Sequence, residues 1–169
     1  MTGWWRRNAV ALVALGVLLP ATVAAIAVQE WGEITGATQP VLVDAGESLE
    51  YVGAVVGPAR AEFVEDDAAP SGAKILSVTV EVDPDPAAPI ACVTPRLREL
   101  GGLGRQWSER SYELGRSLDE DLTTCASDAA SPYRMVLDYV VPDDADGPFT
   151  VEVDSFEGWP VQVRLLVDP

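Results

Sequence analysis

The chain begins with one long apolar stretch in which no charged residue occurs between positions 9 and 28. A bilayer core about 30 Å thick is crossed by roughly 20 apolar residues in a helix. Residues 9–28 are therefore expected to form a transmembrane signal-anchor helix in contact with the lipid bilayer. Arg6 and Arg7 precede this stretch and acidic residues follow it. The positive-inside rule then places residues 1–8 in the cytoplasm and the rest of the chain outside it.

Tryptophans flank the apolar stretch at both ends, with Trp4 and Trp5 before it and Trp31 after it. A helix rises about 39 Å from Trp5 to Trp31. That length is close to the separation of the two interfacial layers of a bilayer, where tryptophan is enriched. The three residues are expected to act as membrane-interface anchors. The alternative is a signal peptide that is cleaved after Ala27, because residues 25–27 fit a small-x-small cleavage pattern.

From residue 48 onward, short alternating or β-branched stretches are separated by turn residues, which is typical of an all-β domain. The clearest stretch is 75–82, where aliphatic and polar residues alternate with a period of two. The expected strands are 49–56, 59–64, 75–82, 90–100, 105–108, 133–141, 149–153 and 161–167. About seven strands at this spacing predict an immunoglobulin-like β-sandwich over residues 48–169. Residues 29–47 are expected to form a juxtamembrane spacer, with a short edge strand at 41–43.

Cys92 and Cys125 are the only cysteines. Outside the cytoplasm such a pair is expected to form a disulfide. Its spacing is not C-x-x-C and no basic residue adjoins either thiol, which argues against a redox role. The pair is therefore interpreted as a structural cross-link.

Several short motifs occur in a characteristic order: a strand, Cys92, a glycine-rich turn, Arg105-Gln106-Trp107, Cys125, Pro132-Tyr133 and Val141-Pro142. In this order the sequence resembles immunoglobulin-like ectodomains of actinobacterial membrane-anchored proteins, over about residues 46–168. The resemblance implies an extracytoplasmic sandwich held at the membrane. That family has no established catalytic residues, so the resemblance implies no catalytic site.

All 27 acidic residues follow Val28, against nine basic residues, so this part of the chain carries a net charge of −18. Such a surface repels nucleic acid, and no nucleic-acid partner is expected. It suits a basic partner or cations. The chain contains no histidine, the commonest general base and zinc ligand. It also lacks the G-x-S-x-G motif of serine hydrolases. We therefore expect no enzymatic activity and no cofactor.

Asp143, Asp144 and Asp146 precede Gly147 in a D-x-D-G sequence that is reminiscent of calcium-binding loops. An EF-hand loop aligned on this glycine would need a glutamate where Val153 stands, so that motif fails. A looser calcium site that combines these residues with Asp83 and Asp85 is a weak candidate. The alternative is that both segments are solvated turns.

Phe156 and Trp159 lie in an expected turn and are the candidate interaction surface, because aromatic residues are enriched at interface hot spots. The expected function is a membrane-anchored interaction module or accessory subunit of a membrane or envelope protein. The alternative is a stand-alone extracytoplasmic domain that binds a ligand or calcium and is secreted after signal cleavage.

Overall fold

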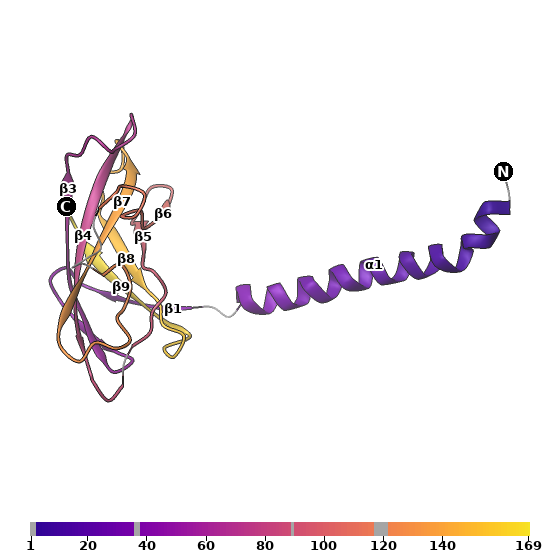
Figure 1. Cartoon of the computed structure of the whole chain (residues 1–169), viewed down its shortest axis with the longest axis horizontal. Helices are drawn as coiled ribbons and strands as arrows, with labels where there is room; N and C mark the ends of the chain where they lie inside the picture. The colour runs from indigo at the N-terminus through magenta and orange to yellow at the C-terminus, as the bar shows by residue number, and fades with distance from the viewer. Residues whose placement is uncertain (1–2, 36–37, 89, 117–121) are drawn as a thin grey trace. The chain divides into compact units, whose positions relative to one another are not determined.

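The computed structural model describes residues 3–35, 38–88, 90–116 and 122–169; in the first range it describes the side chains only of residues 3, 8–9 and 12–26. The chain divides into two compact units, Met1–Ala37 and Thr38–Pro169. The first contains helix α1 and the second contains the β-strands (Figure 1).

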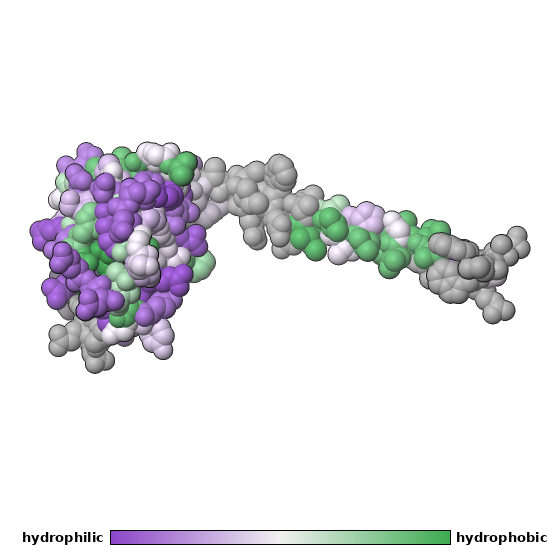
Figure 2. All heavy atoms as spheres, turned by 90° about the horizontal axis from the view of Figure 1, so that it is seen from above, coloured by the Kyte–Doolittle hydropathy of each residue, from purple (hydrophilic) through white to green (hydrophobic). Residues whose placement is uncertain are grey.

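Helix α1 (Gly3–Thr35) extends beyond the expected 9–28 at both ends and contains Pro20. Apolar side chains in its described part are exposed, as the green surface in Figure 2 shows. Seven of them are more than half exposed: Val13, Leu15, Val17, Leu18, Leu19, Val23 and Ile26. The expected interface anchors Trp4, Trp5 and Trp31 lie outside the described side chains.

Within the described residues, no helix combines the length and the apolar character needed to cross a membrane.

The second unit is a β-sandwich of two sheets, which confirms the expected all-β class. One sheet has the order β1-β9-β8-β5-β6 and the other has the order β2-β3-β4-β7. Neighbouring strands are antiparallel, except that β1 runs parallel to β9. Among the residues that the structure describes there are nine strands, against about seven expected: β1 (Gln39–Val43), β2 (Leu49–Tyr51), β3 (Ala54–Val64), β4 (Ala73–Pro84), β5 (Arg96–Glu99), β6 (Gln106–Ser108), β7 (Tyr133–Pro142), β8 (Phe149–Val153) and β9 (Val161–Val167).

The core lies between the two sheets and follows the period of two in the sequence. In β4, the expected inward set of Leu76, Val78, Val80 and Val82 is at most 1% exposed. Burial of each such side chain stabilises the fold by about 1.5–3 kcal/mol. Within the opposite sheet, Phe149 of β8 packs edge-to-face on Trp107 of β6, with ring centroids 6.0 Å apart.

The expected strand 49–56 is instead a hairpin. β2 ends at Tyr51, the chain turns at Val52 and Gly53, and β3 then runs to Val64. Gly57-Pro58 does not stop β3, because the register shifts there between Val56 and Ala59. A bulge of this kind leaves residues out of the ladder and so accommodates a proline, which has no N–H to donate.

Two other boundaries differ from the expectation. Of 90–100, only Arg96–Glu99 forms a strand, because Pro95 lacks an N–H for a ladder. Residues 41–43 do belong to an edge strand, β1. This strand is longer than expected and is part of the five-stranded sheet, where it pairs with β9. The β unit therefore begins at Thr38, ten residues before the expected start at residue 48.

Candidate interaction surface

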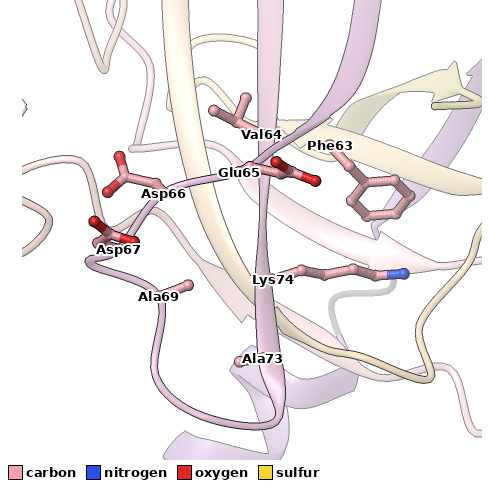
Figure 3. A pocket seen from close by; sticks show the side chains of 8 residues that line it. All are labelled: Phe63, Val64, Glu65, Asp66, Asp67, Ala69, Ala73 and Lys74. Carbon is pink, nitrogen blue, oxygen red and sulfur yellow. The ribbon is translucent and has the colours of Figure 1, made fainter.

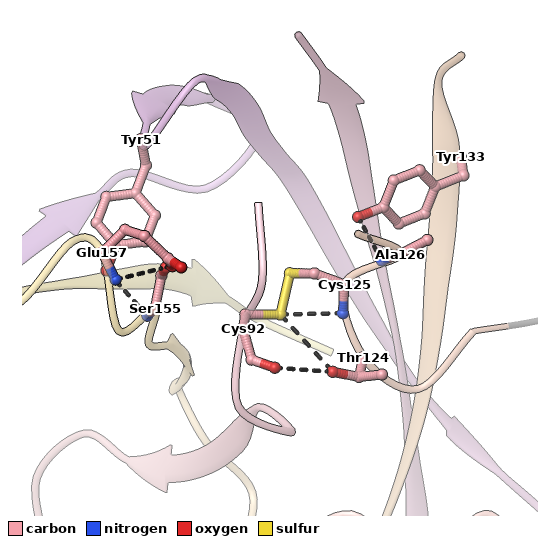
Figure 4. The surroundings of a disulfide bond; sticks show 8 residues. All are labelled: Tyr51, Cys92, Thr124, Cys125, Ala126, Tyr133, Ser155 and Glu157. Atoms are coloured by element: carbon pink, nitrogen blue, oxygen red, sulfur yellow. Dashed lines mark hydrogen bonds between the residues drawn. A yellow bond between two sulfur atoms is a disulfide. The ribbon is translucent and has the colours of Figure 1, made fainter. Parts of the chain in front are cut away.

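The loop between β8 and β9, residues 154–160, is held at both ends by hydrogen bonds to Tyr51 at the end of β2. Tyr51 is 5% exposed. Its hydroxyl donates to the Val161 carbonyl at 2.9 Å and accepts from the Ser155 N–H at 3.1 Å. One side chain of the four-stranded sheet thus holds both ends of a loop that belongs to the other sheet. Figure 4 shows Tyr51 beside the end of the loop at Ser155.

The loop is also braced internally. The Ser155 hydroxyl donates to Glu157 Oε2 at 2.7 Å, and the Ser155 carbonyl accepts from Gly158 N at 3.2 Å. A Cβ at Gly158 would lie 2.3 Å from the Tyr51 hydroxyl oxygen, so only glycine fits between the loop and Tyr51 as they stand. These contacts fix the backbone from which the aromatic residues project.

Phe156 and Trp159 project outward from this braced loop, with 79% and 64% of their surfaces exposed. With Thr38, Val93 and Val161 they line a largely apolar pocket of about 420 Å³. We call residues 154–160, Thr38 and Val93 the aromatic tip. The structure thus brings the two candidate surface residues together around one pocket. Their exposure on a fixed backbone is the geometry expected of contact residues, because little conformational entropy remains to be lost on binding.

The predicted Cys92–Cys125 disulfide is confirmed, with the two Cα atoms 5.3 Å apart. It lies near the aromatic tip: Cys92 forms a β-bridge with Ser155, and Val93 N donates to the Asp154 carbonyl at 2.9 Å. The disulfide, shown in Figure 4, therefore tethers the segment that contains the pocket residue Val93. A stable disulfide is typical of proteins outside the cytoplasm, which supports the expected extracytoplasmic location.

The tip carries two carboxylates. Asp154 Oδ2 accepts a 3.0 Å hydrogen bond from Gln162 Nε2. The hydroxyl of Ser155 holds the pKa of Glu157 below its usual value. Burial raises the pKa of Tyr51, and the nearby negative charges of Asp154 and Glu157 act in the same direction. The tip is thus an apolar surface in a negative potential.

The calcium candidates do not converge on one site. Asp83 and Asp85 lie at the end of β4, whereas Asp143, Asp144 and Asp146 adjoin its beginning, where Ala73 faces Pro142. About ten residues of strand separate the two groups, or roughly 30 Å.

Three of the five candidate carboxylates have a partner within the protein. Asp144 pairs with Arg105 and Asp146 with Lys74, each at 2.8 Å. Asp85 accepts from Ala87 N. Across the described part of the chain, no group of three or more metal-ligating side chains occurs. The composite site considered from sequence is therefore not formed in this structure.

A larger, open pocket lies at the β3–β4 hairpin (Figure 3). Lys74 Nζ stands 4.0 Å from the centre of the Phe63 ring and also pairs with Asp146. On the other side of the hairpin, Asp66 pairs with Arg116 at 3.0 Å. These contacts fasten the hairpin to neighbouring segments, which accounts for Lys74 and Asp66 as structural groups.

Sequence reasoning missed two acidic residues of the tip, Asp154 and Glu157, and the residue that supports it, Tyr51. The two acids had a signal, because they alternate with the aromatics in the sequence DSFEGWP. Tyr51 had no signal in the sequence, since it lies 104 residues from Ser155, whose N–H donates a hydrogen bond to it.

No protein-family model matches the chain, and no curated protein matches its sequence. Two solved structures from Bacillus subtilis are distantly similar, each with a TM-score of 0.47. One is YcdA, a candidate lipoprotein of strain 168, at 15% identity; the match covers 72% of this chain and 38% of YcdA. The other is the YjhA protein, at 14% identity; the match covers 74% of this chain and 97% of YjhA.

Proposed function

We propose that this chain is a non-catalytic extracytoplasmic interaction module that binds a membrane or envelope protein through its aromatic tip. The observation that carries the proposal is the exposure of Phe156 and Trp159 on a braced loop. Large aromatic side chains supply much of the energy of protein interfaces when a partner buries them. Leaving two of them in water beside an apolar pocket has no benefit for the fold, since neither belongs to the buried core.

The strand pairing supports an immunoglobulin-type sandwich as the framework of the module. In that fold, strands A, B and E are neighbours in one sheet and C′, C, F and G in the other. The orders β3-β4-β7 and β6-β5-β8-β9 correspond to these sets. The disulfide departs from the antibody pattern, because it joins the segments before β5 and β7 and not β4 to β8.

We further propose that residues 9–28 hold the module at the membrane, with the N-terminus cytoplasmic. Support comes from the uncharged stretch with Arg6 and Arg7 before it, and from the seven exposed apolar side chains of α1. Flotation with phosphatidylcholine vesicles of the full chain and of a form beginning at Gln29 tests this anchor. The full chain is expected to float with the vesicles, and the form beginning at Gln29 is expected not to float. N-terminal sequencing of the cellular protein would reveal cleavage after Ala27, which would exclude a retained anchor.

Affinity purification from gently solubilised native membranes tests the interaction itself. The full chain is expected to recover a stoichiometric companion, and Trp159→Ala is expected to lose it while retaining its circular dichroism and thermal transition. Tyr112→Ala is the matched control, because Tyr112 is 80% exposed but does not belong to the tip. Equal recovery by wild type and Trp159→Ala would refute the role of the tip.

A further inference from the structure

The two carboxylates of the aromatic tip are bound only to neutral groups in the described structure. Asp154 accepts a hydrogen bond from the Gln162 amide, and Glu157 accepts one from the Ser155 hydroxyl. No ion pair to either carboxylate occurs among the described residues. Asp154 is half-buried in the pocket wall and Glu157 is exposed between the two aromatics in the sequence.

Many basic side chains of the domain are paired with other carboxylates. Among the described residues, ion pairs are formed by Arg60, Lys74, Arg98, Arg105, Arg110, Arg116 and Arg164. No basic residue is among those that line the tip pocket. The tip therefore offers negative charge next to aromatic rings with no direct ion pair in the described structure. Arg164 donates to Gln162, the hydrogen-bond partner of Asp154, at 3.0 Å, and its ion pair is with Glu152.

We propose that the aromatic tip binds a partner segment in which one lysine or arginine is flanked by apolar residues. The inference rests on the proposed function and names the chemistry that the same tip recognises. The apolar side chains would enter the pocket, whose size is at the low end of ligand sites. The cation would lie against Trp159, the aromatic residue that attracts cations best, and within reach of Asp154 and Glu157. An anionic membrane surface would instead be repelled by the two carboxylates.

Paired peptides that differ only in charge test the proposal. The probes are acetyl-Leu-Arg-Leu-amide and the same peptide with neutral citrulline for arginine, added to the full chain in neutral detergent. The readout is the nitrogen-15 NMR signal of the Trp159 indole, assigned by its loss in Trp159→Phe. The arginine peptide is expected to shift this signal and to bind about two- to fivefold more tightly than the citrulline peptide.

Charge removal on the protein provides the second arm. Asp154→Asn keeps the acceptor for Gln162, and Glu157→Gln keeps an acceptor for Ser155. The double variant is expected to lose most of the preference for arginine over citrulline. Glu62→Gln is the matched control, because Glu62 is an exposed acid on β3, away from the tip. Raising the salt concentration should narrow the preference in wild type, since exposed charges are screened.

The outcomes separate this inference from the proposed function. Equal binding of the two peptides, or shifts confined to residues outside the tip, would overturn the inference. If Trp159→Ala still abolishes recovery of the native companion, the proposed function stands without it. If phosphatidylcholine vesicles shift the Trp159 signal and the arginine peptide does not, the tip is a membrane contact and the inference is wrong.

Discussion

The hydroxyl oxygen of Tyr51 occupies the space that a Cβ at Gly158 would need, 2.3 Å away. This contact joins the two sheets of the sandwich at the aromatic tip. A side chain at residue 158 would therefore force Tyr51 or the loop beneath Phe156 and Trp159 to move. The surface that we propose to be functional is thus built on a specific pair of residues from distant parts of the sequence.

Gly158→Ala is expected to lower the free energy of unfolding by about 1–3 kcal/mol, because the added methyl forces Tyr51 or the loop to move. Tyr51→Phe alone removes two hydrogen bonds and is expected to cost about 1–3 kcal/mol. In a Tyr51→Ala background, Gly158→Ala should cost less, since the hydroxyl oxygen and the ring atoms Cζ and Cε2, which lie 2.3, 2.5 and 2.6 Å from the added methyl, are all gone. Urea unfolding of wild type, the two single variants Gly158→Ala and Tyr51→Ala, and their double variant measures the coupling. Equal losses of unfolding free energy from Gly158→Ala in both backgrounds would show that Tyr51 does not cause the cost of the added methyl.

Removal of the disulfide is expected to destabilise the β domain by about 2–5 kcal/mol. Replacing Cys92 and Cys125 together by alanine avoids leaving a free thiol. Because Cys92 adjoins Ser155 and Val93 lines the pocket, the variant should also lose companion binding at temperatures where most molecules remain folded. Denaturant unfolding and companion recovery, measured side by side, test this. A variant with unchanged stability would contradict the structural role.

Arg105 makes the stability of the domain depend on acid pH. Its guanidinium hydrogen bonds lower the pKa of Glu99 and of Asp144 from their usual values. A carboxylate with a lowered folded-state pKa adds stability above its unfolded pKa, and this stability is lost as the pH falls through the folded value. The urea concentration at the unfolding midpoint of wild type is therefore expected to decrease as the pH is lowered below about 4.5. Arg105→Gln should flatten that dependence, and an unchanged pH profile in the variant would refute the assignment.

Glu152 of β8 is 4% exposed and pairs with Arg98 and with Arg164 on the flanking strands. Glu152→Ala leaves two arginines without their acceptor, and breaking such a pair costs about 3–5 kcal/mol when fully buried. Since both arginines are partly exposed, the lower end of this range is expected. Glu152→Leu should cost less than Glu152→Ala because it restores packing. Thermal unfolding distinguishes the two, and identical transitions would contradict the account.

The sequence was a good guide where local pattern determines structure. Alternation in 75–82 predicted the buried face of β4, and the cysteine count predicted the disulfide. It was a poor guide where the outcome depends on long-range pairing. Residues 41–43 join the main sheet only because β9 offers its edge, and β3 passes Pro58 only because a bulge forms opposite β4.

The candidate site shows the same division. The turn residues around Phe156 and Trp159 indicated an exposed aromatic pair, as the structure has it. The bracing by Tyr51 depends on residues more than 100 positions apart, for which one sequence contains no signal. The calcium hypothesis failed as a composite site because proximity was assumed between turns that β4 holds at opposite ends.

In-cell photo-crosslinking from position 156 tests the central claim most directly. A photoreactive phenylalanine analogue replaces Phe156 in the full chain, and the same analogue at Tyr112 serves as the control site. The account predicts one dominant crosslinked membrane or envelope protein from position 156, which disappears with Trp159→Ala and is absent from position 112. Identical crosslinks from both positions, or none from position 156 while the native companion still co-purifies, would contradict it.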